Sequence, residues 1–574
     1  MGSSISSLAL LTVFLLFVSA FSLRPSLPAE KSATPPIVVA ACKASRDPAS
    51  CQLALNQSRH VSPGTTALQL IQSLLNLTFQ NLDTAESQMK HILAGSTGNL
   101  NRTMAANNSL EAIGYSRYRV GLTDQHGLAG DRLKDGRAWL SAALSYQYGA
   151  RSDLRNVNDT ADVIAAMEFM NDTLIATTST ALSMLANYDL HSENTSLWGP
   201  PVTERDGYWE PAGGSWSEFE GGVPKELPPN ATVCNSGGCD YETVQEAVDA
   251  APESKPAERF VIWIKGGVYK ETVRISLYRY NVVLLGDGIG KTVITGSLNV
   301  GQPGMTTSES ATVGVLGDGF MASNITFENT GVGAQAVAFL SDGDHTLMET
   351  CEFKGNQDTL YAKSLRHYYK SCRIQGNVDF IFGNAAAFFQ DCEILVVPRP
   401  FQPEKGEKNA VTAHGRNDPA QTTGFVFHNC SINGTEEYMK LYHSNSKVHI
   451  TYLGRPWKEY SRTVFIGSSF EVIISKDGWS PWQGDFALST LYYGEFENTG
   501  AGGNTAGRVS WSSTIPPDHL NSYSVHNFIQ GDGWIPVSDD AFFICRNIPN
   551  CISNSKYATG SGLLIFFVLM IWIL

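Results

Sequence analysis

A short repeat in the second half of the chain constrains its fold more than any other feature. Four segments, TLMETCEF, YYKSCRI, FFQDCEI and FVFHNCSI, share an apolar or aromatic start followed by Cys-x-Ile or Cys-x-Phe. The first two intervals between their cysteines are 21 and 20 residues, and the third is 38 residues, which indicates a turn without its Cys or a long insertion. A period near twenty, with one short strand at each position, is typical of a parallel β-helix.

The repeat also suggests how its cysteines pair. Neighbouring coils of a β-helix lie about 4.8 Å apart, inside the range of Cα separations that a disulfide tolerates. We therefore predict the disulfides Cys351–Cys372 and Cys392–Cys430. Reduced cysteines in the core are the alternative, which an oxidising compartment disfavours.

Two carboxylates occupy equal offsets in successive repeats. Asp358 lies seven residues after Cys351, and Asp379 lies seven residues after Cys372. Their side chains are therefore predicted to lie in one column, about 5 Å apart. Two carboxylates this close do not ionise independently, which places an acid and a base or nucleophile in one site. Two solvated turn residues are the alternative, but Asp379 lies within the apolar segment VDFIFG.

The first half of the chain has a helical pattern, over residues 37–195. Segments 66–93 and 131–146 are amphipathic, and one helix face is marked at steps of three, four and seven by Val163, Met167, Met170, Leu174, Ala181 and Leu185. We predict an all-α four-helix-bundle domain in which Cys42–Cys51 closes a hairpin. Met and Leu at this spacing are ordinary core residues, and no residue of this half is a catalytic candidate.

Composition marks the other boundaries. Residues 196–230 are rich in Gly, Pro, Trp and Glu without a period and are predicted to be a linker, and residues 231–552 contain the short β-rich runs. The apolar run near the start is too short to span a bilayer and predicts a signal peptide over residues 1–22. The hydrophobic tail, residues 553–574, resembles a GPI-anchor signal, and a simple C-terminal membrane anchor is the alternative.

Glycosylation and charge indicate where the protein acts. Eleven Asn-x-Ser/Thr sequons and an even number of cysteines, ten, favour a secreted glycoprotein with disulfides. The formal net charge of −14 disfavours binding to nucleic acid or to an anionic membrane through bulk charge. Contact with a membrane is then expected only through the C-terminal tail.

Longer motifs identify the second half of the chain. GVYKE, QAVAF, GNQDTLY, VDFIFGNAAAFFQDC and LGRPW occur in this order between residues 267 and 457, and SPWQGDF and LYYGEFENTGAG follow. Together they resemble plant pectin methylesterases over roughly residues 231–550. The helical half is similar to the inhibitor-type domain that precedes many plant members. The resemblance implies a right-handed parallel β-helix, and the hydrolysis of the C6 methyl esters of homogalacturonan to carboxylate and methanol without a metal or organic cofactor.

The same resemblance implies a role for each site residue. Asp379 is expected to be the nucleophile, Asp358 the acid that protonates methanol and then the base that activates water, and Gln357 the stabiliser of the tetrahedral intermediate. Four further residues match substrate contacts of the family: Thr307, Gln335, Arg455 and Trp457. The chemistry is consistent, because a carboxylate nucleophile must be ionised and desolvated. An adjacent Arg lowers its pKa, and amide donors suit a developing oxyanion.

The chain departs from the family pattern at several positions. Ser308 and Glu309 replace the usual residues beside Thr307, and Cys234–Cys239 and Cys545–Cys551 are expected to close small extra loops. No Cys between Cys51 and Cys234 supplies the usual second disulfide of the inhibitor-type domain. The linker also lacks a dibasic site, so release of the N-terminal domain is expected to be inefficient or to use another protease.

The sequence thus predicts a monomeric esterase secreted to the plant cell wall (the apoplast), with a GPI-anchored fraction. Its expected partners are homogalacturonan (pectin) and its own N-terminal domain, which would inhibit it in cis. A glycoside hydrolase or lyase acting on polygalacturonate is one alternative, because paired carboxylates also suit retaining glycosidases. A catalytically silent wall-binding or inhibitor protein is another. Release of methanol, as opposed to new reducing ends, distinguishes these classes.

Overall fold

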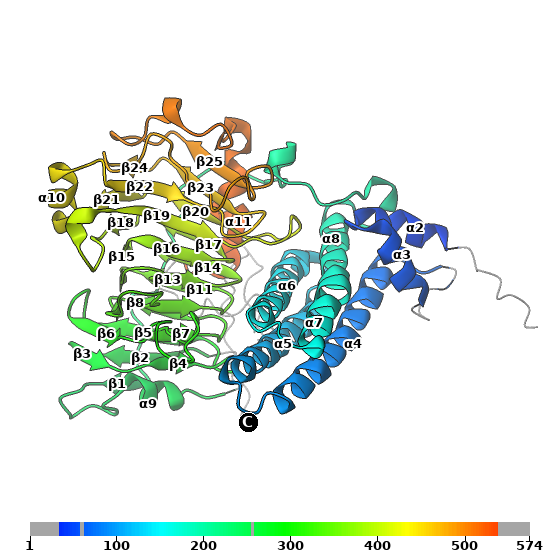
Figure 1. Cartoon of the computed structure of the whole chain (residues 1–574), viewed down its shortest axis with the longest axis horizontal. Helices are drawn as coiled ribbons and strands as arrows, with labels where there is room; N and C mark the ends of the chain where they lie inside the picture. The colour runs from blue at the N-terminus through cyan, green and yellow to red at the C-terminus, as the bar shows by residue number, and fades with distance from the viewer. Residues whose placement is uncertain (1–33, 58–61, 63, 254–257, 538–574) are drawn as a thin grey trace, which may run out of the picture.

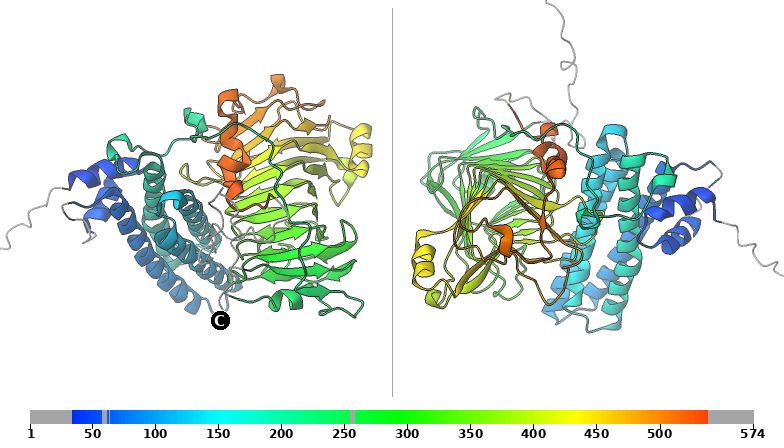
Figure 2. Two further views of the ribbon diagram at one scale, coloured as in Figure 1. Left: turned by 180° about the vertical axis from the view of Figure 1, so that it is seen from behind. Right: turned by 90° about the horizontal axis from the view of Figure 1, so that it is seen from above.

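A computed structural model describes residues 34–57, 62, 64–253 and 258–537. The predicted signal peptide (1–22), the C-terminal tail (553–574) and the pair Cys545–Cys551 lie outside these residues. Within the described ranges, no helix has the length and apolar character needed to cross a membrane. The chain forms a bundle of helices beside a stack of parallel strands (Figures 1 and 2).

The helical half is a bundle preceded by a hairpin. Its long helices are α4 (Ala67–Ala94), α5 (Leu100–His126), α6 (Leu133–Arg155) and the run of α7 (Ala161–Phe169), a π-helical turn (Met170–Ile175) and α8 (Ala176–His191). A capping box fixes the start of α4, since Thr66 and Gln69 exchange hydrogen bonds of 2.9 and 3.2 Å. Gly127 and Gly136 let the ends of α5 and α6 touch, because a Cβ on Gly127 would lie 2.5 Å from the Gly136 Cα. In the hairpin of α2 (Pro36–Ala41) and α3 (Pro48–Gln57), the predicted Cys42–Cys51 disulfide is confirmed.

The second half is a parallel β-helix with three sheets, as the repeat predicted. Every pair of neighbouring strands is parallel, and from β2 to β22 each coil contributes one strand to each sheet in turn. Sheet A contains β1 (Ala231–Val233), β2 (Phe260–Ile264), β5 (Val282–Gly286), β8 (Met321–Ser323), β11 (Thr346–Glu349), β14 (Arg366–Lys370), β17 (Ala386–Gln390), β20 (Gly424–His428), β23 (Arg462–Ile466), β25 (Tyr492–Phe496) and β26 (Ser513–Thr514).

The other two sheets complete the coils. Sheet B contains β3 (Gly267–Lys270), β6 (Thr292–Gly296), β9 (Thr326–Asn329), β12 (Glu352–Lys354), β15 (Arg373–Gly376), β18 (Glu393–Val396), β21 (Ser431–Gly434) and β24 (Ser469–Phe470). Sheet C contains β4 (Val273–Ile275), β7 (Val313–Val315), β10 (Phe339–Ser341), β13 (Leu360–Ala362), β16 (Val378–Gly383), β19 (Glu407–His414) and β22 (His449–Gly454). Short helices lie at its edges: α9 (Val244–Asp249), α10 (Glu436–Ser444) and α11 (Val525–Ile529).

Aromatic residues stack along the core because successive coils are in register. Tyr369 lies on Phe389 at 4.7 Å between ring centroids, Phe389 on Phe427 at 4.5 Å, and Phe427 on Phe465 at 4.5 Å. These residues are paired in sheet A. One aromatic residue of each run therefore lies on the inner face of its strand, whereas Tyr368 and Phe388, beside it in the sequence, belong to a cluster outside sheet A.

The four repeat cysteines are buried free thiols, so the predicted Cys351–Cys372 and Cys392–Cys430 disulfides are wrong. The residues directly after these cysteines are paired in sheet B, which places the cysteines in one column. Side chains at equivalent positions of parallel strands point in the same direction. Their Cβ atoms thus stay about 4.8 Å apart, beyond the roughly 3.5–4.5 Å that a disulfide needs. The Cys372 thiol instead lies 3.5 Å from the Met348 carbonyl oxygen. The predicted Cys234–Cys239 disulfide is confirmed.

The 38-residue interval between the last two cysteines is a long insertion. Glu393 of β18 pairs directly with Ser431 of β21, so no coil is missing between them. The extra residues form the stretch between β18 and β19 and the loop that follows β19.

The segment after α8 packs along the outer face of sheet A. Trp209 stacks on His519 with centroids 4.6 Å apart, Trp216 meets His428 at 4.9 Å, and Phe219 meets Tyr368 at 5.9 Å. We call residues 199–227 the strap. Its residues Trp209, Trp216 and Phe219 belong to an apolar cluster that also contains side chains from β14, β17 and β25. The stretch predicted to be a linker is therefore fixed to the β-helix by side-chain packing.

Candidate active site

The two aspartates of the repeat lie on adjacent coils of sheet C. Asp358 precedes β13 by two residues, Asp379 is the second residue of β16, and Leu360 of β13 pairs with Ile381 of β16. The register of β16 against β19 shifts between Val378 and Ile381, which is a bulge at Asp379. Both aspartates have positive φ, 64° and 51°. Bulges and left-handed residues re-aim side chains at functional sites.

Arg455 distinguishes the two carboxylates. It follows β22 and holds Asp379 through two hydrogen bonds, Nε to Oδ1 at 2.8 Å and Nη2 to Oδ2 at 2.7 Å. Burial raises the pKa of Asp379, and Arg455 opposes that rise. The pKa of Asp358 is raised well above its ordinary value by burial and then by the charge of Asp379. Asp379 is therefore the carboxylate that ionises first, and Asp358 is the one that keeps its proton.

The predicted substrate contacts surround this pair. Gln335 and Gln357 are half-buried and precede β10 and β13 on neighbouring coils, where the Ala336 N–H donates to the Gln357 carbonyl at 3.2 Å. Trp457 is half-buried and packs edge-on against Phe382 at 6.0 Å. Gly415 makes room for it, because a Cβ there would lie 2.8 Å from the Trp457 ring.

Thr307 lies in a turn with Ser308 and Glu309, the two residues that differ from the pattern of the family that the sequence resembles. The Ser310 hydroxyl donates to the Thr307 carbonyl at 2.8 Å. The Glu309 carboxylate accepts from the N–H and hydroxyl of Thr306 at 2.9 and 2.8 Å. Glu309 therefore caps its own turn.

Three aromatic residues of the site were not predicted from the sequence. Tyr361 stacks on Phe382 at 4.1 Å between centroids, and both lie in an apolar cluster on the outer face of sheet C beside Trp457. Each follows one of the two aspartates by three residues, a regularity in QDTLY and VDFIF that marks them as a pair. Trp482, 37% exposed, lies under the Arg455 guanidinium at 4.5 Å. In the part of the chain that the structure describes, no group of His, Cys, Asp and Glu side chains is arranged to hold a metal ion.

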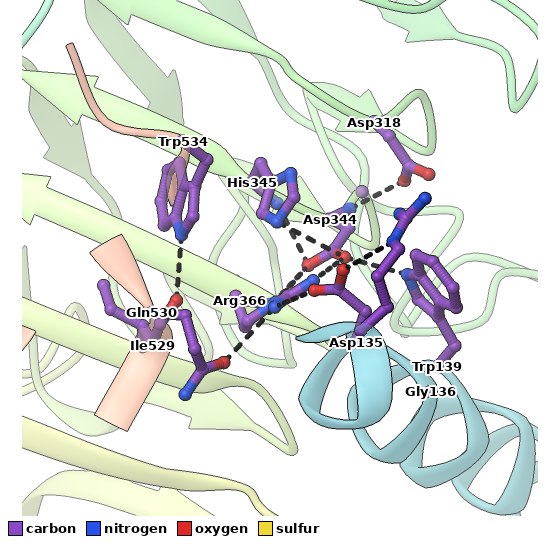
Figure 3. Close-up of polar contacts among 12 residues, drawn as sticks. Asp135, Gly136, Trp139, Asp318, Asp344, His345, Arg366, Ile529, Gln530 and Trp534 are labelled. Carbon is purple, nitrogen blue, oxygen red and sulfur yellow. Dashed lines mark hydrogen bonds and ion pairs between the residues drawn. The ribbon is translucent and has the colours of Figure 1, made fainter. Parts of the chain in front are cut away.

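The helix bundle docks against the β-helix beside this site through buried polar contacts. Arg119 of α5 forms two 2.7 Å hydrogen bonds with Asp318, and the two side chains are 1% and 2% exposed. From α6, Asp135 and Trp139 point at Arg366 and Asp344 of the β-helix (Figure 3), with contacts of 2.7 and 3.0 Å. The interface is thus held by charged side chains that are buried away from solvent.

Further contacts place the bundle on both sides of the aspartate pair. On one side, a Cβ on Gly304, three residues before Thr307, would lie 3.2 Å from the Met104 sulfur of α5. On the other side, Arg46 donates to the Tyr460 hydroxyl at 3.2 Å, three residues after Trp457. Asp153 of α6 interacts electrostatically with Lys363 and Glu309 of the β-helix. Burial raises the pKa of Asp153 to about 6, while Lys363 lowers this pKa and Glu309 raises it. The bundle therefore bridges the two borders of the site.

Comparisons with known proteins agree with this architecture. The family model described as Pectinesterase matches residues 230–532, and the one described as Plant invertase/pectin methylesterase inhibitor matches residues 36–184. The chain is 54% identical over 504 residues to "Probable pectinesterase/pectinesterase inhibitor 64" of Arabidopsis thaliana, covering 86% of this chain and 83% of the relative. It is 35% identical to "Pectinesterase 2" of Citrus sinensis, covering 87% and 93%.

A solved structure supports the same assignment for the β-helix. The pectin methylesterase from carrot matches with a TM-score of 0.51 and 45% identity, covering 54% of this chain and 96% of that one. The predicted combination of a parallel β-helix with an N-terminal inhibitor-type helical domain is confirmed. The chain belongs to the pectinesterase family of carboxylic ester hydrolases and carries the N-terminal domain of the inhibitor family.

Proposed function

We propose that this protein hydrolyses the C6 methyl esters of homogalacturonan, with Asp379 as the nucleophile and Asp358 as the general acid and base. The bidentate Arg455–Asp379 pair beside a carboxyl of higher pKa carries this proposal. It is the asymmetry that nucleophilic catalysis by one of two carboxylates requires.

The reaction proceeds in two balanced halves. The Asp379 carboxylate attacks the ester carbonyl, and the negative charge moves to the carbonyl oxygen, where the Gln357 amide donates to it and Gln335 contacts the substrate. Protonated Asp358 gives its proton to the departing methoxy oxygen, so methanol leaves and an anhydride with Asp379 remains. Asp358, now a carboxylate, takes a proton from water, whose oxygen attacks the galacturonate carbonyl of the anhydride. The Asp379 carboxylate leaves in its ionised form, and the galacturonic acid so formed gives its remaining proton to the solvent.

The sugar ring of the substrate is expected to lie on the aromatic surface next to the pair. Tyr361, Phe382 and Trp457 supply apolar area on the outer face of sheet C, and aromatic faces suit the C–H groups of a sugar ring. Thr307 borders the same surface through the turn that Glu309 caps.

The test uses the whole chain with a protease site inserted in the exposed stretch 192–194, so that the chain can be cut after it has folded. Methanol release from methyl-esterified homogalacturonan is then measured for the cut protein. Asp379→Asn keeps the shape of the side chain and is expected to lower release by at least about 10³-fold. New reducing ends without methanol would indicate a glycoside hydrolase or lyase. If the folded wild type releases no methanol and produces no new reducing ends, the result favours a binding protein.

We further propose that the N-terminal domain inhibits the esterase in cis. The contacts of Met104 and Arg46 on opposite borders of the site support this proposal, since a polymer could not cross the site beneath the bundle. In the second sample the chain is cut and its β-helix part is separated from the bundle by gel filtration. The uncut chain is then expected to release methanol more slowly than this isolated β-helix part. Equal rates would contradict inhibition.

We also infer a secreted, cell-wall location for a monomeric protein, with the GPI-anchored fraction predicted above. Of the eleven sequon asparagines, ten are exposed and Asn433 is half-buried, so glycosylation is sterically open to nearly all of them. A mobility shift on endoglycosidase treatment of the plant protein tests the secretory route, and release from membranes by phospholipase C tests the lipid anchor.

A further inference from the structure

A cavity of about 280 Å³ lies where the helix bundle, the strap and the β-helix meet. Its walls come from α6 and α8 of the bundle, from Glu204 and Trp209 of the strap, and from Arg416 and Tyr523 of the β-helix. The residues of the candidate active site, among them Asp358, Asp379 and Trp457, do not line it. It is therefore a second site, formed only while the three parts are assembled.

Arginines dominate the charge of this cavity. Three of the four that line it have close carboxylates: Arg137 contacts Asp189 and Glu210, Arg366 contacts Asp135 and Asp344, and Arg462 contacts Glu204 at 2.6 Å. Arg416 is different. Its Nη1 lies 3.9 Å from Glu204 Oε2, whereas Arg462 holds Glu204 Oε1, and its Nη2 donates to the Pro419 carbonyl. Two buried guanidinium groups thus share one carboxylate, which leaves an excess of positive charge.

Unused hydrogen-bond donors accompany this charge. The Nε–H groups of Arg137 and Arg416 have no hydrogen-bond partner among the described residues, and each side chain is 5% exposed. Burial, and then repulsion from Arg462, lower the pKa of Arg416 to about 10. A buried cation and two unsatisfied donors are costly to the fold unless an anion or water completes them.

The remaining walls indicate which anion fits. Trp209 and Tyr523 add aromatic surface, and Asn527 and Thr422 add amide and hydroxyl groups. A bare phosphate or sulfate would use the cations and leave these walls without contact. A sugar ring with one carboxylate uses all of them, and the volume is at the small end of ligand sites, which suits one ring.

We propose that this junction cavity binds a uronic acid, whose carboxylate pairs with Arg416 and whose ring lies among Trp209, Tyr523 and the polar side chains. The proposal rests on the charges and walls of the cavity and not on ester hydrolysis. Because all three parts of the chain supply walls, the ligand stabilises the docked arrangement of the bundle on the β-helix.

The test is thermal unfolding and calorimetric titration of the full chain with D-galacturonate at constant ionic strength. The comparison ligands are its methyl ester, which is neutral and nearly the same shape, galactose, which lacks the carboxylate, and acetate, which lacks the ring. Galacturonate alone is expected to raise Tm in a saturable way. An equal rise of Tm with acetate would show that any anion has the effect and that the sugar ring is not recognised. An equal rise of Tm with galactose or the ester would exclude the carboxylate–Arg416 pair.

Two substitutions in α8 separate this cavity from other sites. Ala186→Phe fills it without removing a hydrogen bond, and is expected to abolish the shift. Ala176→Phe, in the same helix, points at a separate cavity of about 390 Å³ and should leave the shift intact. Arg416→Gln is expected to weaken binding by about ten- to a hundredfold.

A substitution in the active site completes the design. Asp379→Asn should keep the galacturonate shift although it abolishes methanol release. A shift that survives Ala186→Phe, or that disappears in Asp379→Asn, would overturn the proposal. The esterase proposal is untouched by either outcome.

Discussion

The ion pair between Arg119 and Asp318 allows the docking of the bundle to be tested in energetic terms. Arg119→Ala removes two 2.7 Å hydrogen bonds and leaves Asp318 at an interface where its side chain is 2% exposed. In the undocked state the same carboxylate faces water, so the substitution penalises the docked state alone. Breaking a buried pair by removing one partner costs about 3–5 kcal/mol.

The expected size of the effect follows from the partners that remain. Asp318 keeps one donor, the N–H of Asp344 at 2.7 Å, which moves the cost to the lower end of that range. Since about 1.4 kcal/mol changes an equilibrium tenfold, we expect the ratio of docked to undocked chain to fall about 10²-fold. The full chain should then release methanol faster, and after cutting at 192–194 its two parts should separate more readily on gel filtration.

The matched control is Arg117→Ala on the same helix. Arg117 pairs with Asp83 and Glu86 inside the bundle, where the acids are 67% and 35% exposed, so its loss is expected to cost at most about 1 kcal/mol and to leave docking unchanged. Methanol release by the uncut chain and separation of the two parts of the cut chain are measured for both variants beside wild type. If Arg119→Ala behaves like Arg117→Ala in both assays, the Arg119–Asp318 pair does not hold the bundle on the β-helix.

Three further predictions concern protonation and thiols. Arg455→Ala removes the opposite charge from Asp379, so the acid limb of the pH profile of kcat/KM in the cut chain should move to higher pH by about one to three units; an unmoved limb would exclude the pairing. The folded-state pKa of Asp153, about 6, lies above its ordinary value, so its contribution to docking is present at low pH and lost as the pH rises through 6. The fraction of cut chain whose two parts separate on gel filtration should rise from pH 5 to pH 7 in wild type, and an equal rise in Asp153→Asn would contradict this assignment. Peptide mapping after alkylation should find thiols labelled only in denaturant at Cys351, Cys372, Cys392 and Cys430; labelling of the native protein would refute their burial.

The sequence predicts the β-helix well because its period is a local property. An apolar or aromatic run followed by a Cys, in four of the coils, marks the repeat, and equal offsets from two of these cysteines place Asp358 and Asp379 on adjacent coils. The prediction of disulfides between the repeat cysteines was wrong because a sequence spacing indicates the distance between Cα atoms but not the direction of the side chains. Parallel strands of one sheet keep their Cβ atoms as far apart as the strands.

Contacts between distant segments have no such periodic signal. The strap has neither helical nor alternating order, and only the folded sheet A shows what its tryptophans pack against. Arg119 and Asp318 are 199 residues apart, and Glu204 and Arg462 are 258 apart. The composition of either partner alone does not reveal the other. Glu309 differs from the family pattern beside Thr307, but the sequence alone does not show that its carboxylate caps its own turn.

The column of buried thiols has a consequence for how this chain must mature. Ten cysteines in an unfolded chain can pair in many ways under oxidising conditions. Once the coils stack, burial raises the pKa of Cys351, Cys372 and Cys392 well above the ordinary value, so almost no thiolate is left to react. Stacking and oxidation are therefore in kinetic competition. A substitution anywhere in the β-helix that delays stacking would appear first as mispaired disulfides in a retained precursor, with the geometry of the active site still encoded but never reached.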